Sequence, residues 1–373
     1  MSLTANQWLN RIRSLPLERT VKIMNVCGGH ERSITMAGLR SALPDQIELI
    51  PGPGCPVCIC PEEDVFEAIQ LALNEDIILV AFGDMLRVPV NVKKNKTRTL
   101  AEAKAQGADI RPIASPTEAV KIAKQNPDMP VVFFAAGFET TTAPVAAMLV
   151  EGVPDNLSVL LSGRLTWPAV AMLLESGEAG FDALVAPGHV ATVMGPEEWR
   201  FVVDRHNMPA AIAGFTTESL LAAMYSVLRQ LIDGRYFLDN CYPDLVRKGG
   251  NPSARAQLKK AFDVGDAKWR GVGIIANSGY SIRDEYQQHD ARRHFPDYAD
   301  DARKRAGEMP PGCDCAGVVL GKIYPNECRL YGKACVPRNP IGPCMVSDEG
   351  ACRIWWANGM RETADLKKQR KTG

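Results

Sequence analysis

The 373-residue chain carries 43 Lys and Arg residues against 43 Asp and Glu residues, so its formal net charge at pH 7 is zero. A balanced charge gives no general attraction to nucleic acids or to anionic membrane surfaces. The composition, 46% hydrophobic and 23% charged, is that of an ordinary globular protein. The length predicts about two or three domains rather than one small core.

The N-terminal residues 1–20 predict an amphipathic helix, because Trp8, Leu9, Ile12 and Leu15 follow helical spacing. The segment lacks the apolar centre and small-residue cleavage site of a signal peptide. No apolar run in the chain approaches the length that crosses a bilayer. We therefore expect a cytoplasmic protein without a membrane segment.

Short apolar runs alternate with amphipathic helical stretches from about residue 20 to 235. The predicted strands are 21–26, 47–50, 76–82, 109–113, 130–136, 157–162, 182–187 and 209–215. Helices are expected between them, for example over 61–73 and 217–232. Near-continuous apolar strands separated by helices are typical of parallel sheets that are covered on both faces. The sequence therefore predicts an α/β protein with two Rossmann-like parallel-sheet domains.

The regular alternation weakens beyond residue 235. Six of the 11 cysteines lie between Cys313 and Cys352, in a segment rich in Gly and Pro. We expect one α/β domain over 1–125, a second over 126–235, and a smaller irregular domain over 236–373. Eleven cysteines in a reducing compartment favour metal binding or redox chemistry over a static disulfide framework.

Nearly every predicted strand ends in a loop that contains glycine and a polar or thiol side chain. The carboxyl ends of parallel strands form the ligand crevice of open α/β sheets. Polar groups at these ends therefore predict one site that both domains share. The candidate site residues in these loops are Cys27, His30, Cys55, Cys58, Glu139, Thr140 and His189.

The segment "CGGHE" places Cys27 and His30 between a strand and a helix. The helix N-terminus is expected to lower the pKa of the Cys27 thiol. A thiolate beside an imidazole is a nucleophile or a soft metal ligand, and ordinary packing of the cysteine is the alternative. The segment "PGHV" supplies His189, which taken alone is more typical of a structural histidine.

The segment "GFETTT" places Glu139 and Thr140 where a strand turns into a helix. Thr140 or Thr141 is expected to cap that helix by accepting hydrogen bonds from its first N–H groups. Glu139 is a candidate general base or hydrogen-bond partner. The chain has neither GxxxxGK[ST] nor a GxGxxG after a strand, so a P-loop and a common dinucleotide site are unsupported.

The segment "PGPGCPVCIC" at residues 51–60 concentrates Cys55, Cys58 and Cys60 on a loop framed by Pro and Gly. A long helix cannot run through such a sequence. Metal binding, disulfide exchange and simple packing all remain open for these thiols.

The C-terminal cysteines give the strongest indication of a metal centre. Cys315, Cys328, Cys335 and Cys352 lie in a loop-rich segment that can wrap around a metal. Their spacing is wider than the CxxC pairs common at zinc sites, and four thiolates also suit a [4Fe–4S] cluster. Spacing alone leaves the ligand set open, because Cys313 and Cys344 compete.

Eight segments, taken in order, carry a family resemblance. They are "CGGHE", "GPGCPVC", "FGDMLRVP", "GFETT", "APGHV", "WRGVG", "DARRHF" and the terminal run from "NECRLYGKAC" to "MVSDEGAC". Together they resemble the hydrogenase maturation factor HypD family from about residue 20 to 356. Each segment alone is weak evidence, but so many in register are highly specific.

The resemblance implies a monomeric scaffold of two α/β domains with a [4Fe–4S] domain. It implies work with a HypC-like chaperone to assemble the transient Fe(CN)2CO group of [NiFe]-hydrogenases. A HypE–HypF-like pair donates the cyanide, and the finished unit passes to the hydrogenase large subunit. The resemblance implies no binding of nucleic acid.

The family's functional residues carry over to matching positions of this chain. Its cluster ligands fall on Cys315, Cys328, Cys335 and Cys352. Its iron-holding cysteine falls on Cys27, with His30 beside it, and its dithiol falls on Cys55 and Cys58. Glu139, Thr140 and His189 would then orient ligands or hydrogen-bond cyanide nitrogens.

Some positions depart from the family pattern. Glu31 stands where a Thr is familiar, and Arg164 stands where a His or Lys is expected nearby. Cys60, Cys313 and Cys344 are additional thiols.

Two other classes of function compete with the scaffold. One is a free-standing iron–sulfur thiol-disulfide oxidoreductase or hydro-lyase that acts on another substrate. The other is a zinc-stabilised binding module, which leaves "CGGHE" and "GFETT" without a role. A cluster hydro-lyase usually leaves one iron without a cysteine ligand, so four competent cysteines argue against it.

Overall fold

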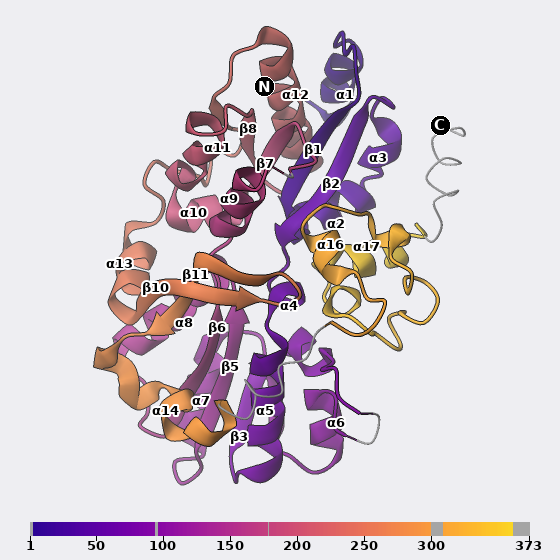
Figure 1. The fold of residues 1–373 in the computed structure, drawn as a ribbon. Coiled ribbons are helices and arrows are strands. Elements are labelled where there is room, and N and C mark those ends of the chain that lie inside the picture. Colours follow the sequence, from indigo (N-terminus) through magenta and orange to yellow (C-terminus); the bar gives the residue numbers. More distant parts are fainter. Residues whose placement is uncertain (1–2, 94–95, 178, 300–308, 361–373) are drawn as a thin grey trace.

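The computed structural model describes residues 3–93, 96–177, 179–299 and 309–360 (Figure 1). Two parallel sheets dominate it, with strand orders β2-β1-β7-β8-β9 and β4-β3-β5-β6. The first sheet contains β1 (Val21–Cys27), β2 (Ile47–Gly54), β7 (Ala183–Pro187), β8 (Ala210–Ala213) and β9 (Leu238–Asn240). The second sheet contains β3 (Ile78–Phe82), β4 (Ile110–Ile113), β5 (Val131–Gly137) and β6 (Leu157–Gly163). All eight predicted strands are confirmed.

Helices cover both faces of each sheet, which explains the near-continuous apolar strands. One face of the first sheet packs against α1 (Ala5–Arg13), α2 (Gly28–Met36), α3 (Leu39–Ala42) and α12 (Thr217–Asp233). Its other face packs against α9 (Trp167–Glu175), α10 (Gly188–Met194), η2 (Pro196–Trp199) and α11 (Arg200–Asp204). The second sheet packs against α7 (Pro116–Gln125), α8 (Glu139–Glu151) and α13 (Pro252–Ala261) on one face, and against α4 (Pro56–Ile59), α5 (Glu62–Asn74) and α6 (Leu100–Ala105) on the other.

Helix α12 illustrates how the sequence sets these elements. The side-chain oxygen of Thr216 accepts a hydrogen bond from the N–H of Ser219 and caps the start of the helix. Gly234, in the left-handed conformation with φ 62°, ends it. Leu220, Met224 and other apolar residues at helical spacing face the first sheet. The predicted helices over 61–73 and 217–232 are both present.

Sheet membership differs from the predicted division at residue 125. That position lies between β4 and β5, which belong to the same sheet, whereas β1 and β2 join β7, β8 and β9 from much later in the chain. Strands β3 to β6 are thus inserted between two parts of the first sheet. Apolar periodicity could not reveal this, because it shows that a strand is buried but not which strand it pairs with.

The predicted third domain also begins too early. Strand β9 belongs to the first sheet, and α13 packs on α8. The antiparallel hairpin of β10 (Phe262–Trp269) and β11 (Gly273–Ile282) packs on β6, followed by η3 (Asp284–His289) and α14 (Ala291–His294). Residues 309–360, here called the Cys-rich segment, are irregular as expected.

The Cys-rich segment contains only short helical elements, α16 (Cys315–Val319), η4 (Pro325–Glu327), η5 (Pro343–Met345) and α17 (Ala351–Ala357). In Figure 1 this segment, coloured yellow, lies beside the point where α4 connects the two sheets. It contacts α2 and β2 as well as α4. Across the described ranges, no helix combines the length and the apolar character that a membrane crossing requires.

Candidate metal and thiol site

The two cysteine- and histidine-bearing loops of the first sheet lie at its topological switch point. Strand β1 pairs with β2 on one side and with β7 on the other, and the later strands of the sheet continue from β7. Cys27 ends β1, and His189 lies in the first turn of α10, which follows β7. Ligands of open parallel sheets bind where such neighbouring strands part. The structure therefore brings Cys27, His30 and His189 to the same edge of the first sheet.

Cys27 lies at the N-terminus of α2, which starts at Gly28. A side chain at position 28 would collide with the backbone of Glu349, so glycine permits this close approach. Burial and the nearby Glu349 carboxylate raise the pKa of the Cys27 thiol to about 12. The expectation of a lowered pKa was wrong, because desolvation outweighs the helix terminus.

His30 is fully buried, and its Nε2–H donates to the backbone oxygen of Ala213 at 3.0 Å. Its Nδ1 is then an acceptor, and it has no hydrogen-bond partner among the described residues. Burial lowers the pKa of His30 to about 4, so the ring is neutral. Phe215 lies between the two imidazoles, with ring centroids 5.0 Å from His30 and 3.9 Å from His189. Sequence patterns gave no indication of this aromatic partner.

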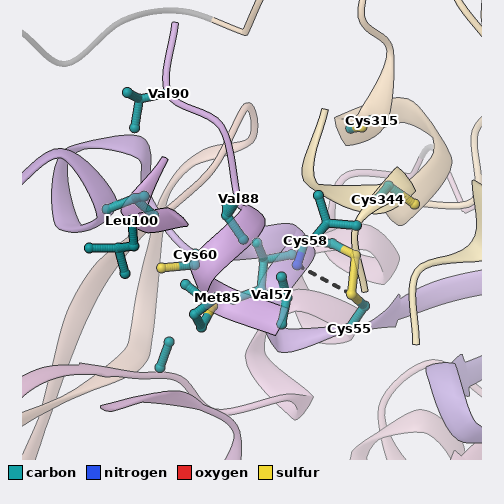
Figure 2. Close-up of a cluster of buried hydrophobic side chains, with 14 of the residues drawn as sticks. Cys55, Val57, Cys58, Cys60, Met85, Val88, Val90, Leu100, Cys315 and Cys344 are labelled. Atoms are coloured by element: carbon teal, nitrogen blue, oxygen red, sulfur yellow. Dashed lines mark hydrogen bonds between the residues drawn. A yellow bond between two sulfur atoms is a disulfide. The ribbon is translucent and has the colours of Figure 1, made fainter. Parts of the chain in front are cut away.

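Cys55 and Cys58 form a disulfide across the single turn of α4 (Figure 2). Pro56 occupies the first helical position, and the N–H of Cys58 donates to Cys55 Sγ at 3.2 Å. Both cysteines are almost completely buried, at 4% and 2% exposure. Of the alternatives left open for this loop, the structure favours a disulfide for these two thiols.

A small cavity, here called the thiol cavity, joins three distant parts of the chain. Cys27, Cys55, Cys58, Cys344 and Glu349 all contribute to its wall. The disulfide therefore lies next to Cys27 on one side and next to the Cys-rich segment on the other. Of the cysteines in that segment, only Cys344 lines the thiol cavity.

The six cysteines of the Cys-rich segment gather around Cys315. Its sulfur lies 3.4 Å from Cys313 Sγ, and hydrogen bonds from Cys315 and Cys352 lower the pKa of Cys344. Two sulfurs accept hydrogen bonds from the backbone. The N–H of Ile341 donates to Cys335 Sγ, and the N–H of Cys352 donates to Cys344 Sγ, each with an N···S distance of 3.3 Å. Such N–H···S contacts stabilise thiolates at metal centres.

The four predicted ligands fit an iron–sulfur cluster by the chemistry of their donors. Each is between 5% and 8% exposed. Cys315 and Cys352 lie in the first turns of the short helices α16 and α17, and Cys328 and Cys335 lie outside the helices of the segment. Within the described ranges, no three His, Cys, Asp or Glu side chains are placed to hold one metal ion. The predicted ligands are Cys315, Cys328, Cys335 and Cys352.

Glu139 lies in a different environment from the thiols. Its carboxylate is fully buried and accepts two hydrogen bonds of 2.7 Å, from the N–H and the hydroxyl of Thr166. Burial raises the pKa of Glu139 to about 7, and its charge in turn raises the pKa of Glu198. Within the described residues no hydrogen bond or ion pair joins Glu139 to a cysteine. The single shared site that the sequence predicts thus does not include Glu139 by direct contact.

Thr140 does not cap helix α8. Phe138 occupies the cap position, and no side chain caps the helix. Thr140 is partly exposed, and no side-chain hydrogen bond of it is found in the described part of the chain. Thr142 instead donates its hydroxyl proton to the backbone oxygen of Phe138 at 3.1 Å.

The Cys-rich segment also contacts the switch point of the second sheet, between β3 and β5. Ser347 donates to Asp84, which follows β3, at 3.2 Å. Trp355 Nε1 donates to the buried Glu31 of α2 at 2.6 Å. Glu31, an unfamiliar residue at its position, thus anchors α17 to the first sheet.

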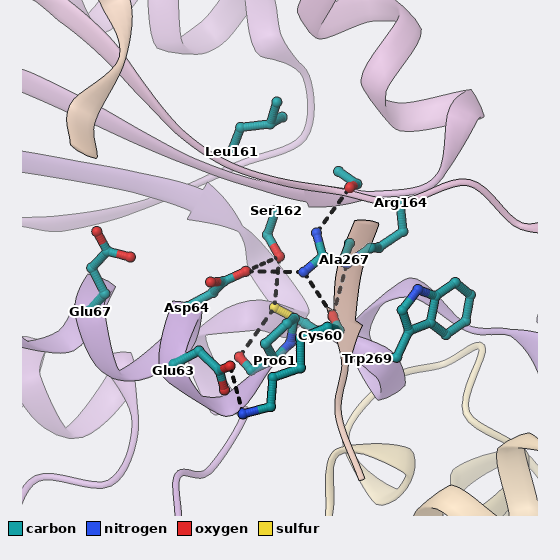
Figure 3. Close-up of polar contacts among 12 residues, drawn as sticks. Cys60, Pro61, Glu63, Asp64, Glu67, Leu161, Ser162, Arg164, Ala267 and Trp269 are labelled. Atoms are coloured by element: carbon teal, nitrogen blue, oxygen red, sulfur yellow. Dashed lines mark hydrogen bonds and ion pairs between the residues drawn. The ribbon is translucent and has the colours of Figure 1, made fainter. Parts of the chain in front are cut away.

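Cys60 belongs to a separate polar network that we call the crossing clasp, formed by Cys60, Asp64, Ser162 and Arg164 (Figure 3). Cys60 Sγ lies 3.4 Å from Ser162 Oγ, which donates to Asp64 at 2.6 Å. Arg164 Nη2 lies 3.5 Å from Asp64. Cys60 therefore does not take part in the thiol cavity.

Comparison with known proteins identifies the relatives of the chain. The HypD family model, described as "Hydrogenase formation hypA family", matches residues 3–359. The hydrogenase maturation factor HypD of Azotobacter vinelandii is 38% identical over 371 residues, covering 97% of this chain and 96% of that protein. The factor of the same name from Escherichia coli K12 is 37% identical over 358 residues, covering 94% and 92%. A putative hydrogenase expression/formation protein of Methanocaldococcus jannaschii is 37% identical over 339 residues, covering 90% and 91%.

Proposed function

Because the chain belongs to the HypD family of hydrogenase formation proteins, we propose that it is the scaffold on which the Fe(CN)2CO group of a [NiFe]-hydrogenase is assembled. The observation that carries the proposal is the thiol cavity. It places Cys27, the Cys55–Cys58 disulfide and Cys344 around one space of about 10 Å³. That is about the space that one water molecule needs, so the cavity has to widen to admit the iron unit. The iron unit is the cargo, and Cys27 is its ligand on this chain.

A soft thiolate suits a low-spin iron that carries cyanide and CO. The raised pKa of Cys27 favours binding of iron with loss of the thiol proton over a thiolate held in advance. His30 and His189 both pack against Phe215 near this end of the first sheet. A neutral His189 can donate from one ring nitrogen to a ligand nitrogen, whereas the Nε2–H of His30 already donates to Ala213. A HypC-like chaperone would supply a second iron ligand, and a HypE–HypF-like pair would supply the cyanide. The hydrogenase large subunit would receive the finished unit.

We assign the [4Fe–4S] ligands to Cys315, Cys328, Cys335 and Cys352. None of these four lines the thiol cavity, whereas Cys344 does and also contacts Cys315 and Cys352. A bound cluster would supply electrons one at a time. Reduction of the Cys55–Cys58 disulfide takes two electrons and two protons and yields two thiols beside Cys27.

A free-standing thiol-disulfide oxidoreductase is less well supported. Such an enzyme needs a disulfide that a protein substrate can reach. Cys55 and Cys58 are buried beneath the Cys-rich segment, with 4% and 2% exposure. This burial favours electron transfer within the molecule.

The infrared spectrum of the protein, purified anaerobically with a HypC-like partner, tests the scaffold. We expect cyanide and CO stretching bands that vanish in Cys27→Ala. Cys241→Ala is the matched control, because Cys241 lies beside Asp239 and does not line the thiol cavity. An intact complex with a full cluster but no such bands would refute the proposal.

Iron and sulfide analysis under anaerobic conditions tests the ligand assignment separately. Cys315→Ala should lose the cluster, and Cys344→Ala should retain it. Loss of iron and sulfide from both variants would mean that Cys344 is a ligand.

A further inference from the structure

A second cavity lies on the hairpin side of the molecule and shares no lining residue with the thiol cavity. Its volume is about 890 Å³, which is within the usual range for small-molecule sites. Residues of α13, of the β10–β11 hairpin and of η2 form its walls. We call it the hairpin cavity. Nothing in the scaffold function uses it.

Basic side chains dominate the mouth of the hairpin cavity. Lys248, Arg255 and Lys259 all line it. Within the described residues the two lysines form no ion pair, so their charges are available to a ligand. Arg283 also lines the cavity, but it is 3.4 Å from Asp263 and is partly neutralised. The local charge therefore favours an anion.

The inner wall is apolar and partly aromatic. Trp167, Phe262 and Tyr280 line it together with Leu258. Phe262 and Tyr280 pack with ring centroids 5.6 Å apart, which gives a fixed surface rather than a mobile one. Such a wall matches the flat, apolar part of a ligand.

A buried carboxyl group lies in the same wall without a partner. Glu198 Oε2 is shielded from solvent and has no hydrogen-bond partner in the described structure. Burial, together with the charge of Glu139, raises the pKa of Glu198 to about 8. At neutral pH the carboxyl group therefore keeps its proton and can donate a hydrogen bond to an acceptor on a ligand.

The mouth is held in place by the backbone around Gly249. The Gly249 N–H donates to both carboxylate oxygens of Glu197 at 3.2 and 3.1 Å. Arg255 Nη1 donates to the backbone oxygen of Gly249 at 2.8 Å. These contacts fix the loop that carries Lys248, so the cations are positioned before a ligand arrives.

We propose that the hairpin cavity binds a small organic anion with a flat apolar body. Its anionic group lies between Lys248 and Lys259, its body lies against Trp167 and Phe262, and a hydrogen-bond acceptor faces Glu198. The site is independent of the iron and cluster chemistry proposed above.

Titration with anilinonaphthalene sulfonate, a fluorescent aromatic anion, tests the proposal on the full chain at low salt. We expect one saturable site per molecule. The double variant Lys248→Ala/Lys259→Ala should weaken binding about threefold to tenfold, because exposed charge contacts are weak. The control is Lys121→Ala/Lys124→Ala, which removes the same charge from exposed positions of α7 outside the hairpin cavity.

A second variant tests the location without changing charge. Ala256 is exposed on α13 and lines the hairpin cavity, so Ala256→Trp should fill it and abolish the saturable site. Circular dichroism would establish that each variant is folded. The proposal is overturned if either cavity variant leaves the dissociation constant within about twofold of wild type, or if the α7 control weakens binding equally.

Discussion

Glu67 on α5 has one paired carboxylate oxygen and one without a partner in the described residues. Its Oε2 accepts from Arg292 Nε at 3.1 Å, whereas the buried Oε1 accepts nothing. Arg292 Nη2 also donates to Asp64 Oδ1 at 2.9 Å, so one guanidinium pairs with two acidic side chains. Burial raises the pKa of Glu67 to about 7, and the nearby Asp64 and Asp290 add to the rise. The "DARRHF" segment thus supplies the cation on which these acids depend.

This arrangement predicts how stability depends on pH. Glu67 binds its proton more tightly in the folded than in the unfolded protein. The stability that this protonation contributes is fully present below about pH 4.5 and is lost as the pH rises through about 7. Glu67→Gln removes that loss. We therefore compare the free energy of unfolding of Glu67→Gln with that of wild type at each pH. We expect the difference to shift in favour of the Gln variant by up to about 3 kcal/mol from pH 5 to pH 8. Urea denaturation at both pH values measures this, and a difference independent of pH would contradict it.

Thr166 supplies both donors to the buried Glu139, one from its backbone and one from its hydroxyl. Thr166→Val keeps the shape but removes the hydroxyl, so the carboxylate loses one of its two donors. We expect a loss of about 1–3 kcal/mol of stability, measured by thermal or urea unfolding. Thr140→Val is the control, because Thr140 is partly exposed, and it should change stability much less. Equal effects would show that the Glu139 hydrogen bond is not the cause.

Single residues also show where sequence reasoning stops. Cys27 and His189 could be placed together from the sequence, because strand ends of a parallel sheet share an edge. Arg292 could not be placed beside Asp64, because 228 positions separate them and no pattern links them. The pKa of Cys27 depends on burial and on Glu349, both of which belong to the tertiary structure.

At the scale of elements, two of the crossings that the chain makes between the sheets lie close together. The first crossing runs from β2 through α4 to α5, and the second runs from β6 to α9. The crossing clasp joins them, through Cys60 and Asp64 on one side and Ser162 and Arg164 on the other. Cys60 therefore has a structural role that its position beside the disulfide concealed.

The first crossing depends on close backbone contact at Gly54. A side chain there would overlap the backbone of Val26 and Cys27 on β1. We expect Gly54→Ala to displace the end of β2 and to cost at least about 1–3 kcal/mol. Gly83→Ala, where an added methyl group meets nothing within 4 Å, is the control. Thermal unfolding and the rate at which a thiol reagent labels Cys27 measure the effect, and equal behaviour of the two variants would contradict it.

The elements themselves could be predicted from the sequence, whereas their assembly could not. Runs such as β5 are buried at every position, so composition alone identifies them as strands. No local sequence pattern indicates that β3 to β6 are inserted between β2 and β7. The loop over 51–60 lies beside Cys27, because β2 pairs with β1 and both strands end at the same edge.

At the scale of the whole molecule, a few long-range contacts hold the Cys-rich segment. Trp355 donates to Glu31, and the guanidinium of Arg40 lies 5.1 Å from the Trp355 ring centroid. Ser347 reaches Asp84, and Arg87 donates to the backbone oxygen of Pro337 at 2.6 Å. Contacts to both sheets therefore fix one wall of the thiol cavity.

Trp355→Phe tests this anchoring. The ring and its burial remain, but Glu31 loses one donor, which costs about 1–3 kcal/mol. We expect faster hydrogen–deuterium exchange in α17 and unchanged exchange in β5 and β6. Trp8→Phe, in the distant α1, should leave α17 unaffected. Unchanged exchange in α17 of Trp355→Phe would show that other contacts suffice to hold the segment.

The insertion of one sheet into the other has a consequence for synthesis on the ribosome. All four strands of the second sheet emerge before β7, β8 and β9, so that sheet can form while the first is still incomplete. The thiol cavity needs Cys27 from near the start and Cys344 from near the end. A chain that stops before residue 309 would contain both sheets but lack one wall of the cavity. Only a nearly complete polypeptide can therefore assemble the thiol cavity.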